Sequence, residues 1–375
     1  MTATQLTPPV ELAGEPLPLV SRARVYVCGI TPYAVTHLGH AATFVWLDTA
    51  VRVLRHHGVE VEVCRNVTDV DDVLTEAAQR AATPYDEFAA MEQFGFERAM
   101  SALGVLRPAH EPRAHAYVAP VVRLAATLLD SGHAYQRAGS VYLRGAPVVA
   151  AAGLESGQAR RLLASYGEHP DDPAKDDAVD VPVWRASTPG QPSWPSPWGP
   201  GRPGWHAECA AMALTLLGPA MDLHGGGADL AFPHHAYEAA IAEAATGVRP
   251  FARRWMRVGL VHYEGSKMAK STGNLVLVPD LLVDQDAAAV RLMLVHRRWW
   301  EPWEYCSESL DEAASLLERL YAAAGTPGGG SGTQAVAAAL RDDLDVPSAV
   351  AVALESGGEA ARFALHVLGL DAAHR

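Results

Sequence analysis

Residues 25–43 read VYVCGITPYAVTHLGHAAT, and this stretch decides how the rest of the chain is interpreted. A β-branched, apolar run ends at Cys28 and is followed by a turn that contains glycine and proline. His37 and His40 then stand at the start of an apolar helix, on one helix face. In a doubly wound sheet, nucleotides bind where a strand ends beside a helix N-terminus, because free N–H groups and the positive helix end favour phosphate.

The sequence after this stretch predicts a parallel sheet. A helix over 37–57 is followed by residues 59–63, which alternate Val and Glu as a strand does. Strand, helix and strand within about 45 residues are typical of a parallel βαβ unit. We therefore expect an α/β fold with a doubly wound parallel sheet. The divisions that we predict are an N-terminal arm at 1–23, the first half of the nucleotide-binding domain at 24–132, an insertion at 133–186, the second half of the catalytic domain at 187–280 and a C-terminal helical domain at 281–375.

Three local patterns give further structural predictions. Residues 73–104 have the period of one long amphipathic helix. Residues 255–263 read as a strand that leads into a charged loop. The glycine-rich residues 327–332 read as a flexible linker within an otherwise helical C-terminal part.

Composition narrows the possible partners and surroundings. The chain has 375 residues and a net charge of −13, so it lacks the broad positive surface of most nucleic-acid binders, and no tRNA partner is expected. Its four cysteines (Cys28, Cys64, Cys209 and Cys306) lie far apart, and no signal peptide is evident, so we expect free thiols and a cytoplasmic protein. No apolar run is long enough to span a membrane, and we expect a monomer.

Four residues can supply a zinc site. Cys28 ends a strand, Cys209 lies near the start of a helix, and His234 and Glu238 are one helical turn apart on the next helix. Thiolate, imidazole and carboxylate are the ligand types that zinc prefers. The alternative is a pair of buried free cysteines and an exposed glutamate.

Two motifs together favour an ATP site. The sequence His37-Leu38-Gly39-His40 at a helix N-terminus can hydrogen-bond the α-phosphate. Residues 267–271 read KMAKS, and their two lysines can hold the β- and γ-phosphates and stabilise departing pyrophosphate. A lysine pair on a loop is otherwise usually solvated, so the order of the two motifs around a βαβ unit carries the inference.

Three further motifs have both a functional and a structural interpretation. Asn66 and Thr68 follow the second strand and can face a ligand, although the acidic residues after them also suit a helix N-terminus. The glycines of residues 225–227, with Asp229 after them, allow close approach to a base and ribose, or form a tight turn. Trp205 can wall an amino-acid pocket or belong to the core.

In this order the motifs resemble those of class I cysteinyl-tRNA synthetases and their shorter relatives, the mycothiol-pathway cysteine ligases. The matching stretches are residues 28–33, 37–40, 66–72, 192–197, 201–206, 225–227, 232–235 and 267–271. The resemblance implies a class I, Rossmann-like doubly wound sheet with an insertion and a C-terminal helical bundle. Because the chain ends soon after that bundle, with no room for an anticodon-binding domain, the ligases are the better match.

The resemblance also implies an activity and a set of site residues. The implied reaction activates L-cysteine with ATP, accompanied by Mg²⁺, as cysteinyl-adenylate, and transfers it to the amine of glucosaminyl-inositol in mycothiol biosynthesis. One zinc ion would bind the cysteine sulfur. The implied metal ligands are Cys28, Cys209, His234 and Glu238; the implied catalytic residues are His37, His40, Lys267 and Lys270; and the implied cysteinyl-adenylate and ATP contacts are Cys28, Gly29, Ile30, Thr31, Thr43, Asn66, Val67, Thr68, Trp205, Gly227, Ala228, Asp229, Val261 and Ser271.

The chain departs from the ligase pattern at three places. Residues 165–170 read SYGEHP where the ligases usually carry ERGGDP. Glu238 stands where the synthetases place a fourth zinc ligand that the ligases generally lack, and residues 297–300 read RRWW in place of the usual pattern. A paralogue acting on another amine, a truncated cysteinyl-tRNA synthetase and a catalytically idle cysteine or zinc sensor are the alternatives. The ATP motifs argue against the sensor, because a binding module would not need them.

Overall fold

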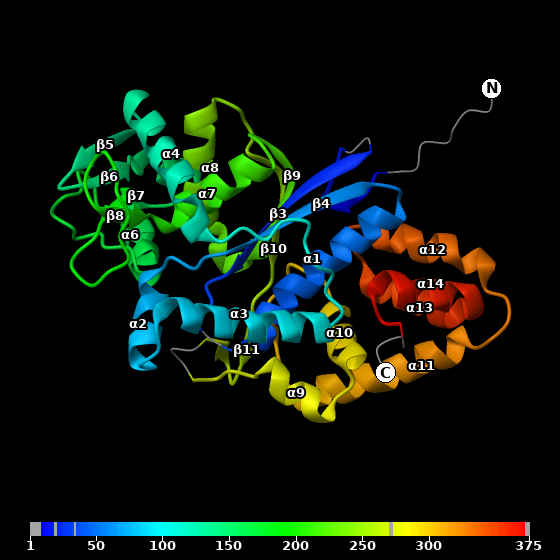
Figure 1. The fold of residues 1–375 in the computed structure, drawn as a ribbon. Coiled ribbons are helices and arrows are strands. Elements are labelled where there is room, and N and C mark those ends of the chain that lie inside the picture. The colour runs from blue at the N-terminus through cyan, green and yellow to red at the C-terminus, as the bar shows by residue number, and fades with distance from the viewer. Residues whose placement is uncertain (1–8, 19–20, 34, 270–272, 372–375) are drawn as a thin grey trace, which may run out of the picture.

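A four-stranded parallel sheet forms the centre of the protein (Figure 1). The computed structural model describes residues 9–18, 21–33, 35–269 and 273–371. The strand order is β10-β9-β3-β4, and every neighbouring pair is parallel. Its strands are β3 (Arg22–Ile30), β4 (Glu60–Val67), β9 (Met221–Gly227) and β10 (Ala252–Val258).

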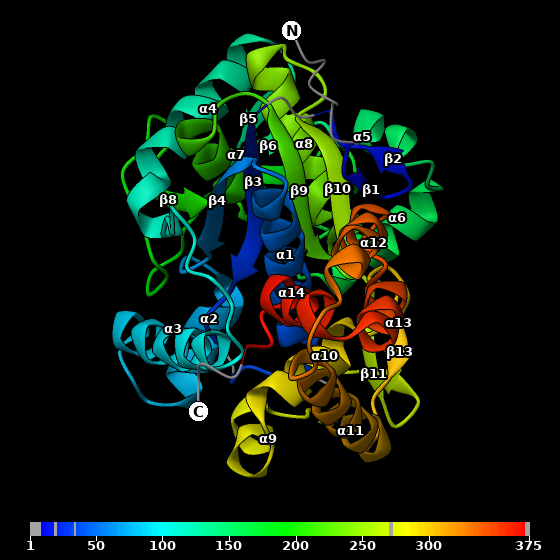
Figure 2. The ribbon, with the colours of Figure 1, turned by 90° about the vertical axis from the view of Figure 1, so that its right-hand side faces the viewer.

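Helices cover both faces of this sheet, which confirms the doubly wound α/β fold. Along β3, Val25 and Val27 pack into one hydrophobic cluster, whereas Tyr26 and Cys28 belong to the cluster on the opposite face, because successive side chains of a strand alternate. Figure 2 shows α1 crossing the first face. The helices are α1 (Leu38–His56) and α10 (Ala287–Val295) on the first face, and α4 (Val118–Asp130), α7 (Trp205–Leu216) and α8 (His234–Thr246) on the second.

The insertion forms a second, antiparallel sheet beside α4, α7 and α8 (Figure 1). Its strand order is β5-β6-β7-β8. The strands are β5 (Ala134–Arg137), β6 (Ser140–Leu143), β7 (Val181–Ala186) and β8 (Gly201–Pro203), and the helices between them are α5 (Ala146–Ala151) and α6 (Ser156–Ser165). Trp184 of β7 is fully buried and belongs to the second cluster, so the insertion shares its core with the central domain.

The single helix predicted over 73–104 is wrong, because two helices occupy this segment. They are α2 (Asp72–Arg80) and α3 (Tyr85–Ala102), and the short 3₁₀ helix η1 (Ala114–Tyr117) precedes α4. Pro84 caps α3 with an extended backbone. A proline disfavours helical geometry in the residue before it, so the helix ends before Pro84 and a new one begins after it.

The strand predicted over 255–263 is also interrupted. β10 ends at Val258, and β11 (Val261–Tyr263) pairs instead with β12 (Ser266–Lys267) and β13 (Trp303–Glu304). The break falls at Gly259, where a Cβ would lie 2.2 Å from the carbonyl oxygen of Glu301. The chain therefore turns where another segment's backbone passes too close for a side chain. Helix α9 (Val278–Asp284) follows the charged loop.

Four helices pack against α1 and α10 as a C-terminal bundle (Figure 1). They are α11 (Ser307–Ala324), α12 (Gly330–Arg341), α13 (Val346–Ser356) and α14 (Gly358–Leu368). Since α12 begins at Gly330, the predicted linker 327–332 is partly helical. Near the other terminus, the short strands β1 (Glu11–Leu12) and β2 (Glu15–Pro16) form a hairpin. Among the described residues, no helix is long and apolar enough to cross a membrane.

A buried arginine ties the bundle to the central domain. Arg291 of α10 donates to the carbonyl oxygens of Leu368, at 2.6 Å, and Leu103, at 2.9 Å. Its third contact is with Asp48 of α1, 2.5 Å away, and both side chains are almost completely buried. Asp48 also pairs with Arg52 at 2.7 Å. Three separate parts of the chain therefore meet at one guanidinium group.

Candidate active site

Two sulfurs and an imidazole meet at the end of the central sheet. The alternation along β3 directs Cys28 toward α7 and α8, which carry Cys209 and His234. One potential ligand atom from each residue lies within 4.8 Å of the other two, and all three residues are buried. The structure thus brings together three of the four predicted zinc ligands.

Glu238, the fourth predicted ligand, lies beside this group but is already engaged. Its Oε2 is 3.9 Å from the Cys28 sulfur and 2.9 Å from Nε2 of His224. Its Oε1 is buried and has no hydrogen-bond partner among the described residues. The alternative of an exposed glutamate is wrong, since Glu238 is fully buried.

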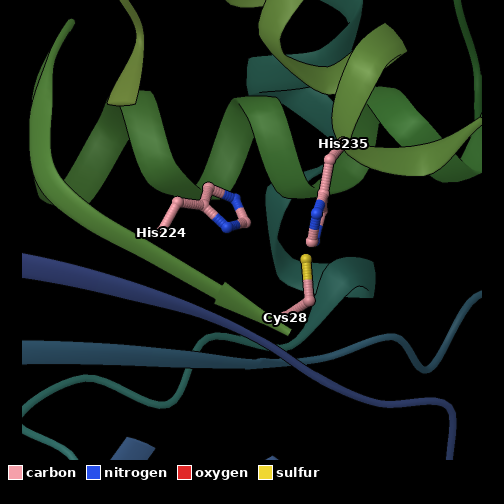
Figure 3. A group of neighbouring side chains, drawn as sticks. All are labelled: Cys28, His224 and His235. Atoms are coloured by element: carbon pink, nitrogen blue, oxygen red, sulfur yellow. The ribbon is translucent and has the colours of Figure 1, made fainter. Parts of the chain in front are cut away.

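Two histidines that the sequence analysis did not select complete the surroundings of Cys28. One ligand atom each of Cys28, His224 and His235 also lies within 4.8 Å of the others. Figure 3 shows the Cys28 sulfur pointing toward the His235 ring, with His224 approaching from the neighbouring strand. Neither ring nitrogen of His235 has a hydrogen-bond partner in the described part of the chain, although the residue is fully buried. The adjacent histidines at 234–235 are the sequence signal that could have identified it.

The donor set fits zinc chemically. Buried sulfur, imidazole and carboxylate groups are the ligand types of zinc sites, and buried polar atoms normally have partners. Oε1 of Glu238, Nδ1 of His224 and both nitrogens of His235 have none among the described residues. A cation bound beside Cys28 would be a partner for these unpaired nitrogen and oxygen atoms.

The two sulfurs differ in their protonation. The hydrogen bond with Cys28, helped by the neighbouring His234, lowers the pKa of Cys209 to about 6. Burial and the adjacent Cys209 raise the pKa of Cys28 well above its usual value. Near neutral pH the pair therefore carries one thiolate, on Cys209, next to an imidazole whose own pKa that thiolate raises despite its burial.

The His37–His40 motif has a defined geometry at the N-terminus of α1. The backbone N–H of Gly39 donates to Nδ1 of His37 at 3.1 Å, so His37 caps the helix. A neutral ring that accepts at Nδ1 carries its hydrogen on Nε2, which makes that nitrogen a donor. The rings of His37 and His40 stack with centroids 3.9 Å apart. A Cβ at Gly39 would lie 2.9 Å from the His37 ring, so a larger residue there would displace that ring.

The predicted adenylate contacts at the ends of β3 and β4 form a tight junction next to Cys28. The N–H of Gly29 donates to Oδ1 of Asn66 at 2.8 Å, and Nδ2 of Asn66 donates to Oγ1 of Thr68 at 2.9 Å. A Cβ at Gly29 would lie 1.6 Å from the Asn66 carbonyl oxygen. Ile30 pairs with Val67 across the strands. The Asn66 amide thus serves the protein's own backbone geometry.

Three further predicted contacts lie directly after β3, in α1 and at the start of β11. Thr43 hydrogen-bonds the carbonyl of Gly39, at 3.3 Å, and Thr31 accepts from the N–H of Tyr33, at 2.8 Å. Val261 is buried, and its carbonyl accepts from the N–H of Met268 at 2.9 Å.

One predicted catalytic residue is paired with a predicted binding residue. Nζ of Lys267 lies 2.5 Å from Oδ2 of Asp229, in the 3₁₀ helix η2 (Ala228–Ala231) that follows Gly227. Both side chains are partly exposed. Lys270 and Ser271 lie outside the described residues.

Backbone hydrogen bonds join the entry to α1 with the segment that follows the predicted lysine motif. The N–H of Leu38 donates to the carbonyl of Val276 at 2.9 Å, and the N–H of Val278 donates to the carbonyl of Thr36 at 3.0 Å. Asn274 anchors the loop itself by donating to the Tyr263 carbonyl at 2.8 Å. The entry to α1 and the end of the lysine loop therefore form one hydrogen-bonded unit.

Trp205 lies against the proposed metal ligands. Its ring stacks on His234 with centroids 4.3 Å apart. The ring of Tyr166 also stacks with Trp205, at a centroid distance of 6.1 Å, and the Tyr166 hydroxyl donates to the Asp229 carbonyl at 3.0 Å. The insertion segment 165–170, where the sequence departs from the ligase pattern, thus reaches the site directly. Its irregular sequence gave no signal of this contact.

Comparison with known proteins also indicates a class I synthetase catalytic domain. The chain matches the family model described as tRNA synthetases class I (C) catalytic domain over residues 18–315. The L-cysteine:1D-myo-inositol 2-amino-2-deoxy-alpha-D-glucopyranoside ligase of Mycolicibacterium vanbaalenii is 45% identical over 341 residues, which cover 88% of this chain and 79% of that protein. The ligase of the same name from Acidothermus cellulolyticus is 44% identical, over 88% of this chain and 83% of its own length.

A solved structure resembles this one in fold. Mycobacterium tuberculosis methionyl-tRNA synthetase in complex with methionyl-adenylate superposes with a TM-score of 0.66 and 19% identity, covering 90% of this chain and 81% of its own. At this identity the likeness concerns the fold alone.

Proposed function

Because the chain belongs to the L-cysteine:1D-myo-inositol 2-amino-2-deoxy-alpha-D-glucopyranoside ligase family of class I synthetases, and is an ATP-dependent ligase, we propose that it joins L-cysteine to glucosaminyl-inositol in mycothiol synthesis. The reaction proceeds in two steps, through cysteinyl-adenylate. The single observation that carries the proposal is the buried group of Cys28, Cys209 and His234, in a chain that also has the His37–His40 motif.

Selection of cysteine follows from the donor set. Cys28, Cys209 and His234 would hold zinc, with the substrate thiolate or Glu238 completing the shell. When bound, zinc supplies affinity for a thiolate, which a serine hydroxyl cannot match because its pKa is far higher and oxygen is a poorer partner in a sulfur-rich site. Size alone discriminates poorly between side chains as similar as those of cysteine and serine. The Trp205 ring, stacked on His234, would contact a cysteine side chain bound at this metal.

Activation uses the two ATP motifs. A carboxylate oxygen of cysteine attacks the α-phosphorus, a new P–O bond forms, and the bond to the pyrophosphate oxygen breaks. The Nε2–H of His37 and the neighbouring His40 donate to the α-phosphate as negative charge builds on it. Lys267, released from Asp229, and Lys270 stabilise the departing pyrophosphate, and Asp229 then becomes available to the ribose. A Mg²⁺ ion that accompanies ATP would supply further positive charge for the phosphates.

Transfer completes the reaction. The amine of the acceptor attacks the cysteinyl carbonyl carbon, a C–N bond forms, and the C–O bond to the phosphate breaks. The amine loses a proton, and AMP leaves. Gly29, Thr68 and Gly227 contact the adenylate and hold it in place while the amine approaches.

Mass spectrometry of the products tests this function. With cysteine, ATP and glucosaminyl-inositol, the expected products are the cysteinyl amide, AMP and pyrophosphate, and serine should give far less product. Cysteine-dependent ATP–pyrophosphate exchange without amide would refute the acceptor and favour another amine. Charging of tRNA by the purified protein would instead identify a truncated cysteinyl-tRNA synthetase, and absence of exchange would indicate a sensor.

A further inference from the structure

The turn that follows α6 places a buried carboxylate close to the candidate zinc ligands. Glu168 is 5% exposed. Its Oε2 lies 3.2 Å from Nη2 of Arg185 and 3.9 Å from Nζ of Lys175, whose side chain is also buried. Its Oε1 lies 3.8 Å from Nε2 of His206, which is beyond hydrogen-bond distance, and this buried nitrogen has no hydrogen-bond partner among the described residues. Two cations thus hold one oxygen of Glu168, and the other is directed at a histidine.

That histidine connects Glu168 to His234. Nδ1 of His206 and Nδ1 of His234 are 3.0 Å apart, and both residues are buried. A hydrogen bond between two such nitrogens requires one to donate and the other to accept. In a neutral His206, a hydrogen on Nε2, directed toward the Glu168 carboxylate, leaves Nδ1 as the acceptor. His234 then donates from Nδ1 and keeps the lone pair of Nε2 for a metal.

We propose that Glu168 is a positioning residue for His234 and acts through His206. By attracting the Nε2 hydrogen of His206, it fixes the tautomer and orientation of both rings, so that Nε2 of His234 is presented to the metal together with the two sulfurs. Partners behind a metal-bound histidine commonly have this effect and contribute about 10–100-fold to metal affinity. The inference rests on the zinc site proposed above and deepens it, because it assigns a role to the segment 165–170 that distinguishes this chain.

Zinc affinity, measured by competition with a chromogenic chelator, tests the proposal independently of activity. Glu168→Ala is expected to weaken zinc binding by about 10–100-fold. Glu168→Gln keeps an oxygen that can accept from His206, so its affinity should stay within about threefold of the original protein. Asp171→Asn is the matched control, because that carboxylate in the same turn is exposed and pairs only with Arg160 among the described residues; it should bind zinc unchanged.

A double-mutant cycle distinguishes action through His206 from general loosening of the fold. If Glu168 acts through His206, then Glu168→Ala in a His206→Ala background should cause no further loss of zinc affinity. A full additional loss in that background would overturn the proposal. So would equal losses in Glu168→Gln and Glu168→Ala, since these would point to the unpaired cations Arg185 and Lys175. Far-ultraviolet circular dichroism verifies folding; if the alanine variant does not fold, a loss of well over threefold in Glu168→Gln overturns the proposal.

Zinc binding by the unaltered protein distinguishes failure of the zinc site from failure of the role proposed for Glu168. If it binds no zinc, the zinc site itself is refuted. If it binds one zinc tightly and Glu168→Ala binds equally well, the zinc site stands and the positioning role of Glu168 fails.

Discussion

Replacing Arg291 by methionine should destabilise the whole protein, because this guanidinium joins α1, the loop after α3 and the end of α14. Methionine fills a similar volume but leaves the carbonyls of Leu368 and Leu103 without a donor and Asp48 with one fewer cation. Removing one member of a buried ion pair typically costs about 3–5 kcal/mol. Asp48 keeps Arg52 at 2.7 Å, which favours the lower half of this range.

The expected change in melting temperature follows from chain length. Unfolding entropy is about 2.1 cal/mol/K per residue, which gives about 0.8 kcal/mol/K for 375 residues. A loss of about 3–4 kcal/mol therefore lowers the melting temperature by about 4–5 °C.

Differential scanning calorimetry measures this change. The matched control is Arg80→Met, which removes a cation paired with Glu76 where both side chains are 67% exposed, and it should shift the melting temperature by less than about 1 °C. If Arg291→Met melts within 1 °C of that control, the contacts of Arg291 add nothing to the stability of the protein and the reasoning is refuted.

Three further predictions concern the site. Gly29→Ala should lower the melting temperature and abolish ATP–pyrophosphate exchange, because its Cβ would lie 1.6 Å from the Asn66 carbonyl oxygen; unchanged calorimetry would contradict this. His37→Asn, which keeps a capping side chain, should reduce exchange by about 10²–10³-fold with less than about 1 kcal/mol change in stability, and near-normal exchange would count against a phosphate contact. At pH 8, Cys209 with its pKa of about 6 is already a thiolate, whereas Cys28 with its raised pKa is a thiol, so zinc binding expels the Cys28 proton. Calorimetric titration with zinc in two buffers of different ionisation enthalpy measures the protons released on binding. Cys28→Ser should release about one proton fewer than the original protein, and an equal release would disprove this difference in pKa.

Local patterns predicted the centre of the fold because they reflect backbone physics. The apolar run before Cys28 and the alternation at 59–63 both became strands of the parallel sheet, and the helix after His37 formed as expected. The convergence of Cys28, Cys209 and His234 could also be anticipated, since strand and helix termini meet at one edge of such a sheet.

Other features depended on contacts that no local pattern contains. The break at Gly259 is imposed by the backbone of Glu301, which is distant in sequence. The hydrogen bond between His224 and Glu238 joins a strand to a helix. Glu168 lies in an irregular insertion whose sequence has no clear period, and tertiary packing buries it near His206. Long-range packing decided these cases, and local propensity does not report it.

Because side chains alternate along β3, the register of this strand decides which of them face the two sulfurs and His234. A one-residue insertion or deletion that shifted the strand's register would send every side chain to the opposite face. Val27 would then point toward Cys209 and His234, and the Cys28 thiol would be buried against α1 among aliphatic side chains. Composition would be almost unchanged, but the sulfur pair would be lost. In this protein, single-residue length changes near β3 should therefore be far less tolerated than equal changes in surface loops, which offers a direct test by deletion scanning.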